Sequence, residues 1–142
     1  MIKQIIFDLD GVIIDSRELH WKSFSMALEQ CCPKYTISEE EHIAKYDGLP
    51  TRKKLQILTE EKGLPIEMYG KIFEKKQKWT MRTMQEEYKK CPKLRIILDK
   101  LINSGIQVSL ASNSVRDTII TALHCKGILH YFNHIISNED VL

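Results

Sequence analysis

The sequence lacks any long hydrophobic run and any large excess of charge. No apolar stretch approaches the roughly 20 residues that a membrane-spanning helix needs. The net charge of +2 is too small to imply a nucleic-acid partner by itself. Because the first residues run directly into a strand that carries acidic residues, they are unlike a signal peptide, and we expect a cytoplasmic protein.

Paired cysteine motifs are also missing. The four cysteines include no CxxC pair and no histidine at zinc-site spacing, so we expect reduced thiols. The adjacent Cys31 and Cys32 are either a redox pair or the end of a helix. With 43% hydrophobic and 28% charged residues, the composition is that of an ordinary globular protein. The length of 142 residues allows one modest domain or a small core with an inserted module.

The most informative stretch is IIFDLDGVIID, residues 5–15. Its apolar run Ile5–Phe7 predicts a short strand that is buried on both faces and ends at a turn. Side chains alternate along a strand, so Asp8 and Asp10 can project to the same side while Leu9 enters the core. Two carboxylates are therefore expected at the carboxyl end of this strand, where open α/β sheets bind ligands.

Two close carboxylates repel each other unless a cation lies between them. A hard divalent cation such as Mg²⁺ would relieve the repulsion between Asp8 and Asp10 and would also bind phosphate oxygens. The residue pattern leaves two alternatives, a calcium-type loop and a plain strand-to-turn junction. A calcium loop needs further oxygen ligands, which Val12, Ile13 and Ile14 do not supply.

The string FDLDGVIIDS closely resembles the first motif of the haloacid dehalogenase-like (HAD) hydrolases, in particular the branch of small-molecule phosphatases and β-phosphoglucomutase. The resemblance implies that Asp8 is the nucleophile that becomes an aspartyl-phosphate. It implies that Asp10 is the general acid/base, and that Asp8 and Asp10 are the Mg²⁺ ligands, with Asp10 contributing its backbone carbonyl. Asp10 favours phosphoryl transfer over the dehalogenase branch, whereas the many lysines leave the Schiff-base chemistry of the phosphonatase branch open.

The same resemblance implies an α/β fold, a partial HAD-like (Rossmann-like) parallel sheet core with an inserted all-helical cap. We expect the cap at residues 16–88 and the incomplete core at residues 1–15 and 89–142. Cap helices are expected to begin at Ser16, at the capping box Ser38–Glu41, at Arg52 and at Ile66.

The last expected cap helix, residues 66–90, is rich in lysine and arginine. This composition is compatible with a nucleic-acid face. Interleaved glutamates and apolar residues, including Phe73, instead favour a solvated cap helix whose apolar side faces inward. We therefore expect no nucleic-acid partner.

Three residues of the expected cap are candidates for substrate contact. The segment YDGLPTRKKL resembles the cap loop of the family, which implies contacts from Gly48 and Arg52, and arginine is a strong phosphate donor. Alternatively, Arg52 is solvated in the first turn of the next helix, which we expect Thr51 to cap. His20 lies where phosphoglucomutase-like members carry a histidine near the cap hinge, or it is an ordinary surface histidine.

A second motif follows the strand expected at residues 106–112. The string SLASNS resembles the second HAD motif, which implies that Ser112, with Asn113 beside it, binds the transferring phosphoryl group. Ser114 and Asp117 also indicate a helix start. The two interpretations are compatible, because a helix N-terminus after a strand end is itself an anion site.

A third strand is expected at residues 134–137, after which the sequence ends. The third HAD motif, a lysine, and the fourth, an acidic pair, are not found, so we expect a front portion of a longer protein or a gene that ends here. Without them, Mg²⁺ would be held weakly. The first strand would then form an uncovered apolar edge, which favours a homodimer or a domain swap.

Two functions are consistent with these features. The first is a Mg²⁺-dependent phosphatase or phosphomutase that acts on a small phosphorylated metabolite through an aspartyl-phosphate. Whether it is a phosphatase or a mutase depends on whether water or a second substrate hydroxyl reaches that intermediate. The second is a catalytically dead HAD remnant that acts as a binding or self-associating module.

Overall fold

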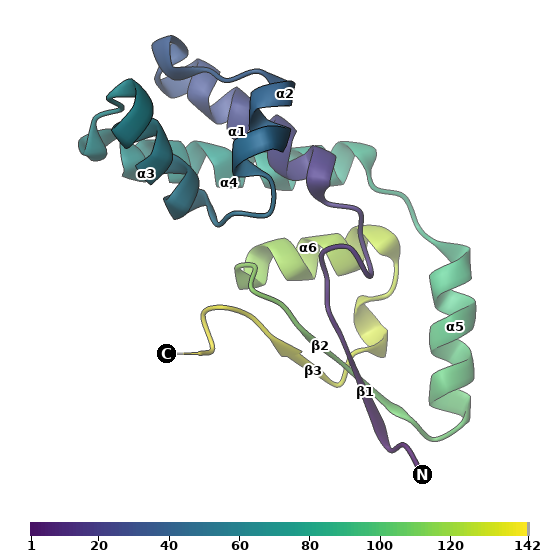
Figure 1. Ribbon diagram of the computed structural model, residues 1–142. Helices are drawn as coiled ribbons and strands as arrows, with labels where there is room; N and C mark the ends of the chain where they lie inside the picture. The colour runs from purple at the N-terminus through teal and green to yellow at the C-terminus, as the bar shows by residue number, and fades with distance from the viewer. Residues whose placement is uncertain (142) are drawn as a thin grey trace. The chain divides into compact units, whose positions relative to one another are not determined.

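Three parallel strands form the sheet of the computed structural model, which describes residues 1–141 (Figure 1). They are β1 (Gln4–Phe7), β2 (Gln107–Ala111) and β3 (His134–Ile136), in the order β1-β2-β3. In the register, Ile5 lies opposite Val108, and Leu110 lies opposite Ile135. The predicted α/β fold with a parallel sheet is confirmed.

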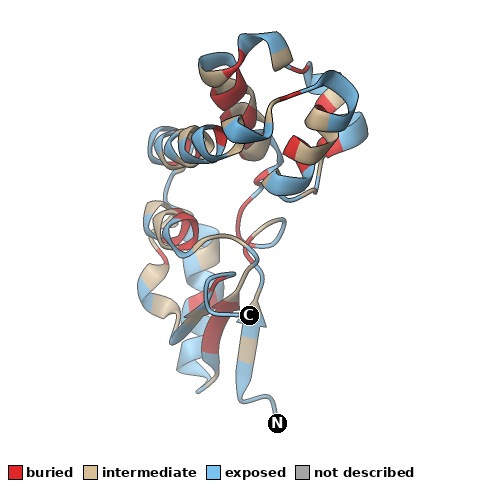
Figure 2. Ribbon diagram, turned by 90° about the vertical axis from the view of Figure 1, so that its left-hand side faces the viewer, coloured by how far each residue is buried: buried red, intermediate tan, exposed pale blue. Residues whose placement is uncertain are grey.

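The strands differ in burial. Val108 and Leu110 of the central β2 are fully buried, whereas Ile6 of β1 is 61% exposed (Figure 2). The prediction that the first strand is buried on both faces is therefore wrong, because the face that carries Ile6 is exposed. Within residues 1–141 β1 pairs with β2 alone, so its other edge is also open. The predicted apolar edge at β1 is confirmed.

The chain divides into two compact units. One, here called the sheet unit, joins Met1–Ser16 with the residues from Met84 onward, and the other, the helical unit, is Arg17–Thr83. Besides the strands, the sheet unit holds α5 (Pro92–Asn103), α6 (Arg116–Lys126) and the short η4 (Leu129–Tyr131). The functional division into a core and a cap, with boundaries after residues 15 and 88, stays a prediction.

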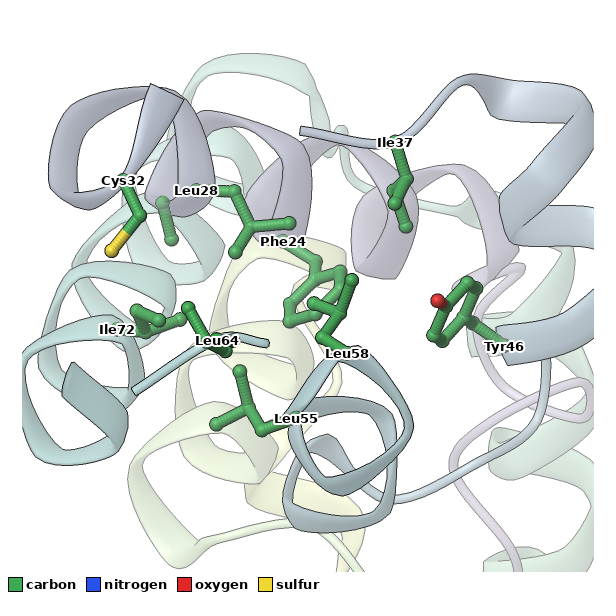
Figure 3. Close-up of a cluster of buried hydrophobic side chains, with 10 residues drawn as sticks. Phe24, Leu28, Cys32, Ile37, Tyr46, Leu55, Leu58, Leu64 and Ile72 are labelled. Atoms are coloured by element: carbon green, nitrogen blue, oxygen red, sulfur yellow. The ribbon is translucent and has the colours of Figure 1, made fainter. Parts of the chain in front are cut away.

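The helical unit has no strand within its described residues. Its elements are α1 (Arg17–Cys31), η1 (Pro33–Tyr35), α2 (Glu39–Glu41), the π-helical turn η2 (His42–Tyr46), α3 (Thr51–Lys62), η3 (Ile66–Met68) and the start of α4 (Tyr69–Glu87). A buried apolar cluster that includes Phe24, Leu28, Leu55, Leu58 and Leu64 joins them (Figure 3). Each such side chain contributes about 1.5–3 kcal/mol on burial, so this cluster stabilises the unit.

Two details of helix capping differ from the sequence prediction. The Oγ of Ser38 accepts a hydrogen bond from the Glu41 N–H at 3.1 Å, as expected, but the Glu41 carboxylate pairs with Lys62 at 2.8 Å. The prediction that Thr51 caps α3 is wrong. Thr51 is the first helical residue, and Pro50, with φ −58°, occupies the N-cap position.

Helix α4 is the basic helix of the sequence. Its predicted inward side is only partly correct, because Ile72 and Met84 are fully buried while Phe73 is 40% exposed. Glu74 pairs with Lys78 one turn away, as expected of a solvated face. No helix within residues 1–141 is long and apolar enough to cross a membrane.

The four cysteines are free thiols. Cys31 is the last residue of α1, and Cys32 is the N-cap residue of η1. Cys31 and Cys32 therefore lie at the end of a helix, which was one of the two interpretations of this pair.

Candidate functional site

A cavity of about 510 Å³ opens at the carboxyl ends of the three strands. It is lined by the last residues of each strand and by those that follow them: Ile6, Phe7, Asp8, Ala111, Ser112, Asn113, Ile136, Ser137, Asn138 and Val141. Parallel strands bring their carboxyl ends to one edge of the sheet, which is where α/β proteins bind ligands. The fold thus brings together three predicted site residues, Asp8, Ser112 and Asn113.

Asp8 is exposed at the cavity wall directly after β1. The next residue, Leu9, is fully buried, and its N–H donates to Asp8 Oδ1 at 2.7 Å. The expected alternation holds for this pair, because Leu9 anchors the chain in the core while Asp8 lines the cavity. One carboxylate oxygen is held by the backbone, and Oδ2 is available to a ligand.

Asp10 lies in a tight turn and is not among the residues that line the cavity. Gly11 follows it with φ +74°, a left-handed conformation that favours glycine, and the Gly11 N–H donates to the Ile14 carbonyl at 2.8 Å. The Ser114 hydroxyl donates to Asp10 Oδ2 at 3.3 Å. Ser114 therefore positions the Asp10 carboxylate. The helix start indicated at Ser114 and Asp117 is found at Arg116, with Val115 as the N-cap residue of α6.

Ser112 follows β2 directly. Its N–H donates to the Ile136 carbonyl of β3 at 3.0 Å, and its Oγ accepts from the Ser114 N–H at 3.1 Å. Because the hydroxyl accepts this bond, its own proton is available for an anion in the cavity. Asn113 is exposed beside it. Contact of Ser112 and Asn113 with a phosphoryl group stays a prediction.

Sequence reasoning missed two polar residues of the cavity wall, Ser137 and Asn138. They follow β3 as Asp8 follows β1 and Ser112 follows β2. That shared position was readable in the sequence, because a third strand was expected to end there. Both the N–H and the hydroxyl of Ser137 donate to Asp140 Oδ2 at 2.7 Å, so this wall of the cavity is held in place.

Glu139 and Asp140 bind the loop after β3 to the start of α6. The Arg116 guanidinium donates to Asp140 Oδ2 at 2.6 Å, and the Arg116 N–H donates to Glu139 Oε2 at 2.7 Å. Hydrogen bonds from Arg116 and then from Ser137 hold the pKa of Asp140 well below its usual range. The helix N-terminus that was expected to bind an anion is therefore already occupied by Glu139.

The other predicted site residues belong to the helical unit. His20 is half-buried on α1, Gly48 has φ +74° in the turn before α3, and Arg52 is exposed in the first turn of α3. None of them is among the residues that line the cavity. Their contact with a substrate stays a prediction.

Asp8 and Asp10 carry hard oxygen atoms of the kind that Mg²⁺ binds. Within residues 1–141 there is no group of three or more His, Cys, Asp or Glu side chains that could hold a metal ion. Mg²⁺ does not require such a group, because it is commonly bound through one or two carboxylates, water and substrate phosphates. The exposed Asp8 carboxylate beside the cavity fits this mode, so the donor set is compatible with Mg²⁺.

Two features identify the class of protein. An aspartate lies at the end of the first strand of a parallel α/β unit, and a helical segment is inserted after that strand. Residues 5–142 match the family of haloacid dehalogenase-like hydrolases, and the chain belongs to this family. It is 27% identical over 141 residues to the pyrophosphatase PpaX of Bacillus velezensis, an alignment that covers 99% of this chain and 61% of that protein. It is 25% identical over 142 residues to the phosphorylated carbohydrates phosphatase of Thermotoga maritima, covering 99% of this chain and 63% of that protein.

Solved structures show the same fold. CbbY from Rhodobacter sphaeroides in complex with phosphate matches with a TM-score of 0.79 and 20% identity, covering 99% of this chain and 65% of that chain. β-Phosphoglucomutase from Clostridium difficile matches with a TM-score of 0.73 and 21% identity, covering 99% of this chain and 64% of that chain. The chain thus spans somewhat less than two thirds of the length of these relatives.

Proposed function

We propose that this chain carries the phosphoryl-transfer site of a Mg²⁺-dependent phosphatase that acts on a small phosphorylated metabolite. The observation that carries the proposal is the cavity that Asp8 shares with Ser112 and Asn113 at the carboxyl edge of the sheet. Relatives named pyrophosphatase, phosphorylated carbohydrates phosphatase and phosphoglycolate phosphatase support a substrate that bears phosphate. In this proposal the helical unit is the cap that selects the substrate, through His20 and the Gly48–Arg52 loop.

The reaction has two steps. In the first, a carboxylate oxygen of Asp8 attacks the phosphorus atom, an aspartyl-phosphate forms, and Asp10 donates a proton to the leaving oxygen as the bond to it breaks. In the second, water attacks the phosphorus atom, Asp10 accepts a proton from that water, and the Asp8 carboxylate and phosphate are released. Ser112 and Asn113 donate hydrogen bonds that hold the phosphoryl oxygens in line.

Asp8 and Asp10 are the residues that would hold Mg²⁺. When bound, the ion offsets the negative charge of the phosphoryl group and of the two aspartates. Ser114 keeps the Asp10 carboxylate in place through its hydroxyl. We propose hydrolysis rather than transfer to a second substrate, because water is an acceptor that needs no binding site of its own.

Hydrolysis of p-nitrophenyl phosphate tests this function. The chain with Mg²⁺ is expected to turn over, and Asp8→Asn is expected to lower the rate at least about 10³-fold, because the nucleophile is removed. Asp117→Asn is the matched control, since Asp117 is an exposed carboxylate in the first turn of α6. Equal rates for the chain and for Asp8→Asn would contradict the proposal and favour a binding module without catalysis.

We also propose that two chains associate through the edge of β1. Ile6 and Ile2 are 61% and 68% exposed, and an edge strand presents unpaired N–H and carbonyl groups to another chain. Light scattering is expected to give the mass of two chains, and Ile6→Lys the mass of one. Val12→Lys is the control, because Val12 is 56% exposed but lies outside the strand. A monomeric native chain would contradict this association.

A further inference from the structure

The helical unit contains a buried pair of bases that the proposed reaction does not use. Lys54 Nζ, from α3, lies 2.9 Å from His42 Nε2, from the π-helical turn η2. Lys54 is only 3% exposed and His42 is fully buried. Lysine side chains are rarely buried to this extent unless a carboxylate accompanies them.

Within residues 1–141 no carboxylate forms an ion pair with Lys54 or His42. Lys54 Nζ also lies over the Phe24 ring, 5.5 Å from its centroid. Asp47 is the acid whose charge acts on both bases, but its carboxylate pairs with Arg17 at 3.1 Å. The positive end of Lys54 is thus packed against an aromatic ring and an imidazole.

Hydrogen-bond donors around the pair lack acceptors. When His42 Nε2 accepts from Lys54, its Nδ1 carries the ring proton, and this buried atom has no hydrogen-bond partner in the described part of the chain. The hydroxyl of Tyr46, on the same turn and likewise fully buried, has none either. The His42 and Tyr46 rings stack with centroids 6.3 Å apart, and Tyr46 belongs to the apolar cluster of Figure 3. Such π-helical turns are rare and occur frequently at functional sites.

Further positive charge comes from two other helices. Burial and then the charge of Lys76 on α4 lower the pKa of Lys54 to about 8. Burial, the charge of Lys54, and lesser effects of His20 on α1 and of Lys76 lower the pKa of His42 to about 4. A buried base without a counter-ion costs stability, so its presence is better explained by a ligand than by packing.

We propose that Lys54 and His42 form an oxyanion-binding site in the helical unit, whose ligand is the phosphate or carboxylate group of a small metabolite. The anion supplies a further acceptor and a counter-charge to the Lys54 ammonium, while His42 Nε2 keeps its own hydrogen bond from Lys54. Because the site lies within the helical unit, it can be tested without hydrolysis at Asp8, and failure of either proposal leaves the other standing.

The test is nuclear magnetic resonance of the full chain with ¹⁵N-labelled lysine side chains, titrated at pH 8 with inorganic phosphate or with acetate. The Lys54 signal is assigned by its loss in Lys54→Met. We expect one of the two anions to raise the pKa of Lys54 by at least about one unit, a tenfold gain in proton affinity. A rise with inorganic phosphate identifies a phosphate group as the ligand, and a rise with acetate identifies a carboxylate group.

Lys53→Met is the matched control, because Lys53 is the exposed neighbour on the same helix. This variant is expected to keep the full response of Lys54. If Lys54→Met perturbs folding, Lys54→Arg replaces it, because arginine keeps the positive charge. The proposal is overturned if neither anion moves the pKa of Lys54, or if sodium chloride at equal ionic strength moves it as far.

Discussion

The two units differ in the environment of the charged groups that we propose as ligand sites. In the sheet unit, Asp8 is exposed at an open cavity, and Asp140 is fixed by hydrogen bonds at the surface. In the helical unit, Lys54 and His42 are withdrawn from solvent, and no carboxylate in the described part of the chain forms an ion pair with them. The proposed site in the sheet unit is therefore open to a cation and a phosphate from solvent. In the proposed site of the helical unit, a bound anion would balance a buried positive charge.

Loss of the acid/base at Asp10 is expected to have the largest effect on the sheet unit. Asp10→Asn should lower steady-state turnover of p-nitrophenyl phosphate about 10²–10⁴-fold, because water is no longer deprotonated in the second step. p-Nitrophenolate leaves without protonation, so the first step should persist as a burst of one p-nitrophenol per chain in stopped-flow absorbance. Loss of the burst together with turnover would show that Asp10 serves the first step or the fold.

Acid is expected to destabilise the helical unit next most strongly. The pKa of His42 falls from 6.5 to about 4 on folding, so the unfolded chain binds more protons between these values, and stability is lost as pH falls from 6.5 to 4. The loss should be on the order of 2 kcal/mol after screening. Urea titrations at pH 7 and pH 4.5 can follow this unit through its tryptophans, Trp21 and Trp79.

His42→Gln should flatten this pH dependence, and His134→Gln, a change of an exposed histidine on β3, should leave it intact. If His42→Gln kept the full dependence, the buried imidazole would not be its source.

Removal of the Ser114 hydroxyl is expected to have a moderate effect. Ser114→Ala removes one hydrogen bond from the Asp10 carboxylate, and kcat should fall about 3- to 10-fold, since one such bond contributes about 1 kcal/mol. Ser114→Thr should restore the rate. Ser104→Ala, which removes a serine hydroxyl at the exposed end of α5, should leave it unchanged. An equal loss in all three variants would mean that the Ser114 bond does not position Asp10.

The smallest expected effect concerns Glu139 at the start of α6. Glu139→Gln keeps the hydrogen bond from the Arg116 N–H but removes the charge at the helix terminus, and should cost about 0.5 kcal/mol in thermal unfolding. High salt should remove the difference, because this contact is exposed. A loss of several kcal/mol that salt does not change would point to a buried role for this carboxylate.

Local pattern was sufficient to predict much of the sheet unit. The apolar run before Asp8 predicted β1, and alternation predicted a buried Leu9 beside an exposed Asp8. Burial of β1 was predicted wrongly, because it depends on which elements pack on each face of the sheet, and a short apolar run in one strand does not encode that. The Ser114–Asp10 bond joins two loops distant in sequence, so a helix-start pattern alone could not reveal it.

The helical unit was harder to predict in its details. Lys54 stands within the basic string TRKKL, which is typical of a solvated helix. A signal was present, because Lys54 lies four residues before the buried Leu58 and therefore shares its helical face. Its pairing with His42 depends on the π-helical turn, which short-range periodicity does not distinguish from an α-helix.

The most direct test of the central claim is to trap the aspartyl-phosphate. The chain is mixed with p-nitrophenyl phosphate and Mg²⁺, reduced with borohydride, which converts an acyl phosphate to an alcohol, and analysed by peptide mass spectrometry. We predict reduction at Asp8, dependent on substrate and absent at Asp10 and Asp15. Turnover without modification of Asp8, or reduction at another carboxylate, would contradict the assignment of Asp8 as the nucleophile.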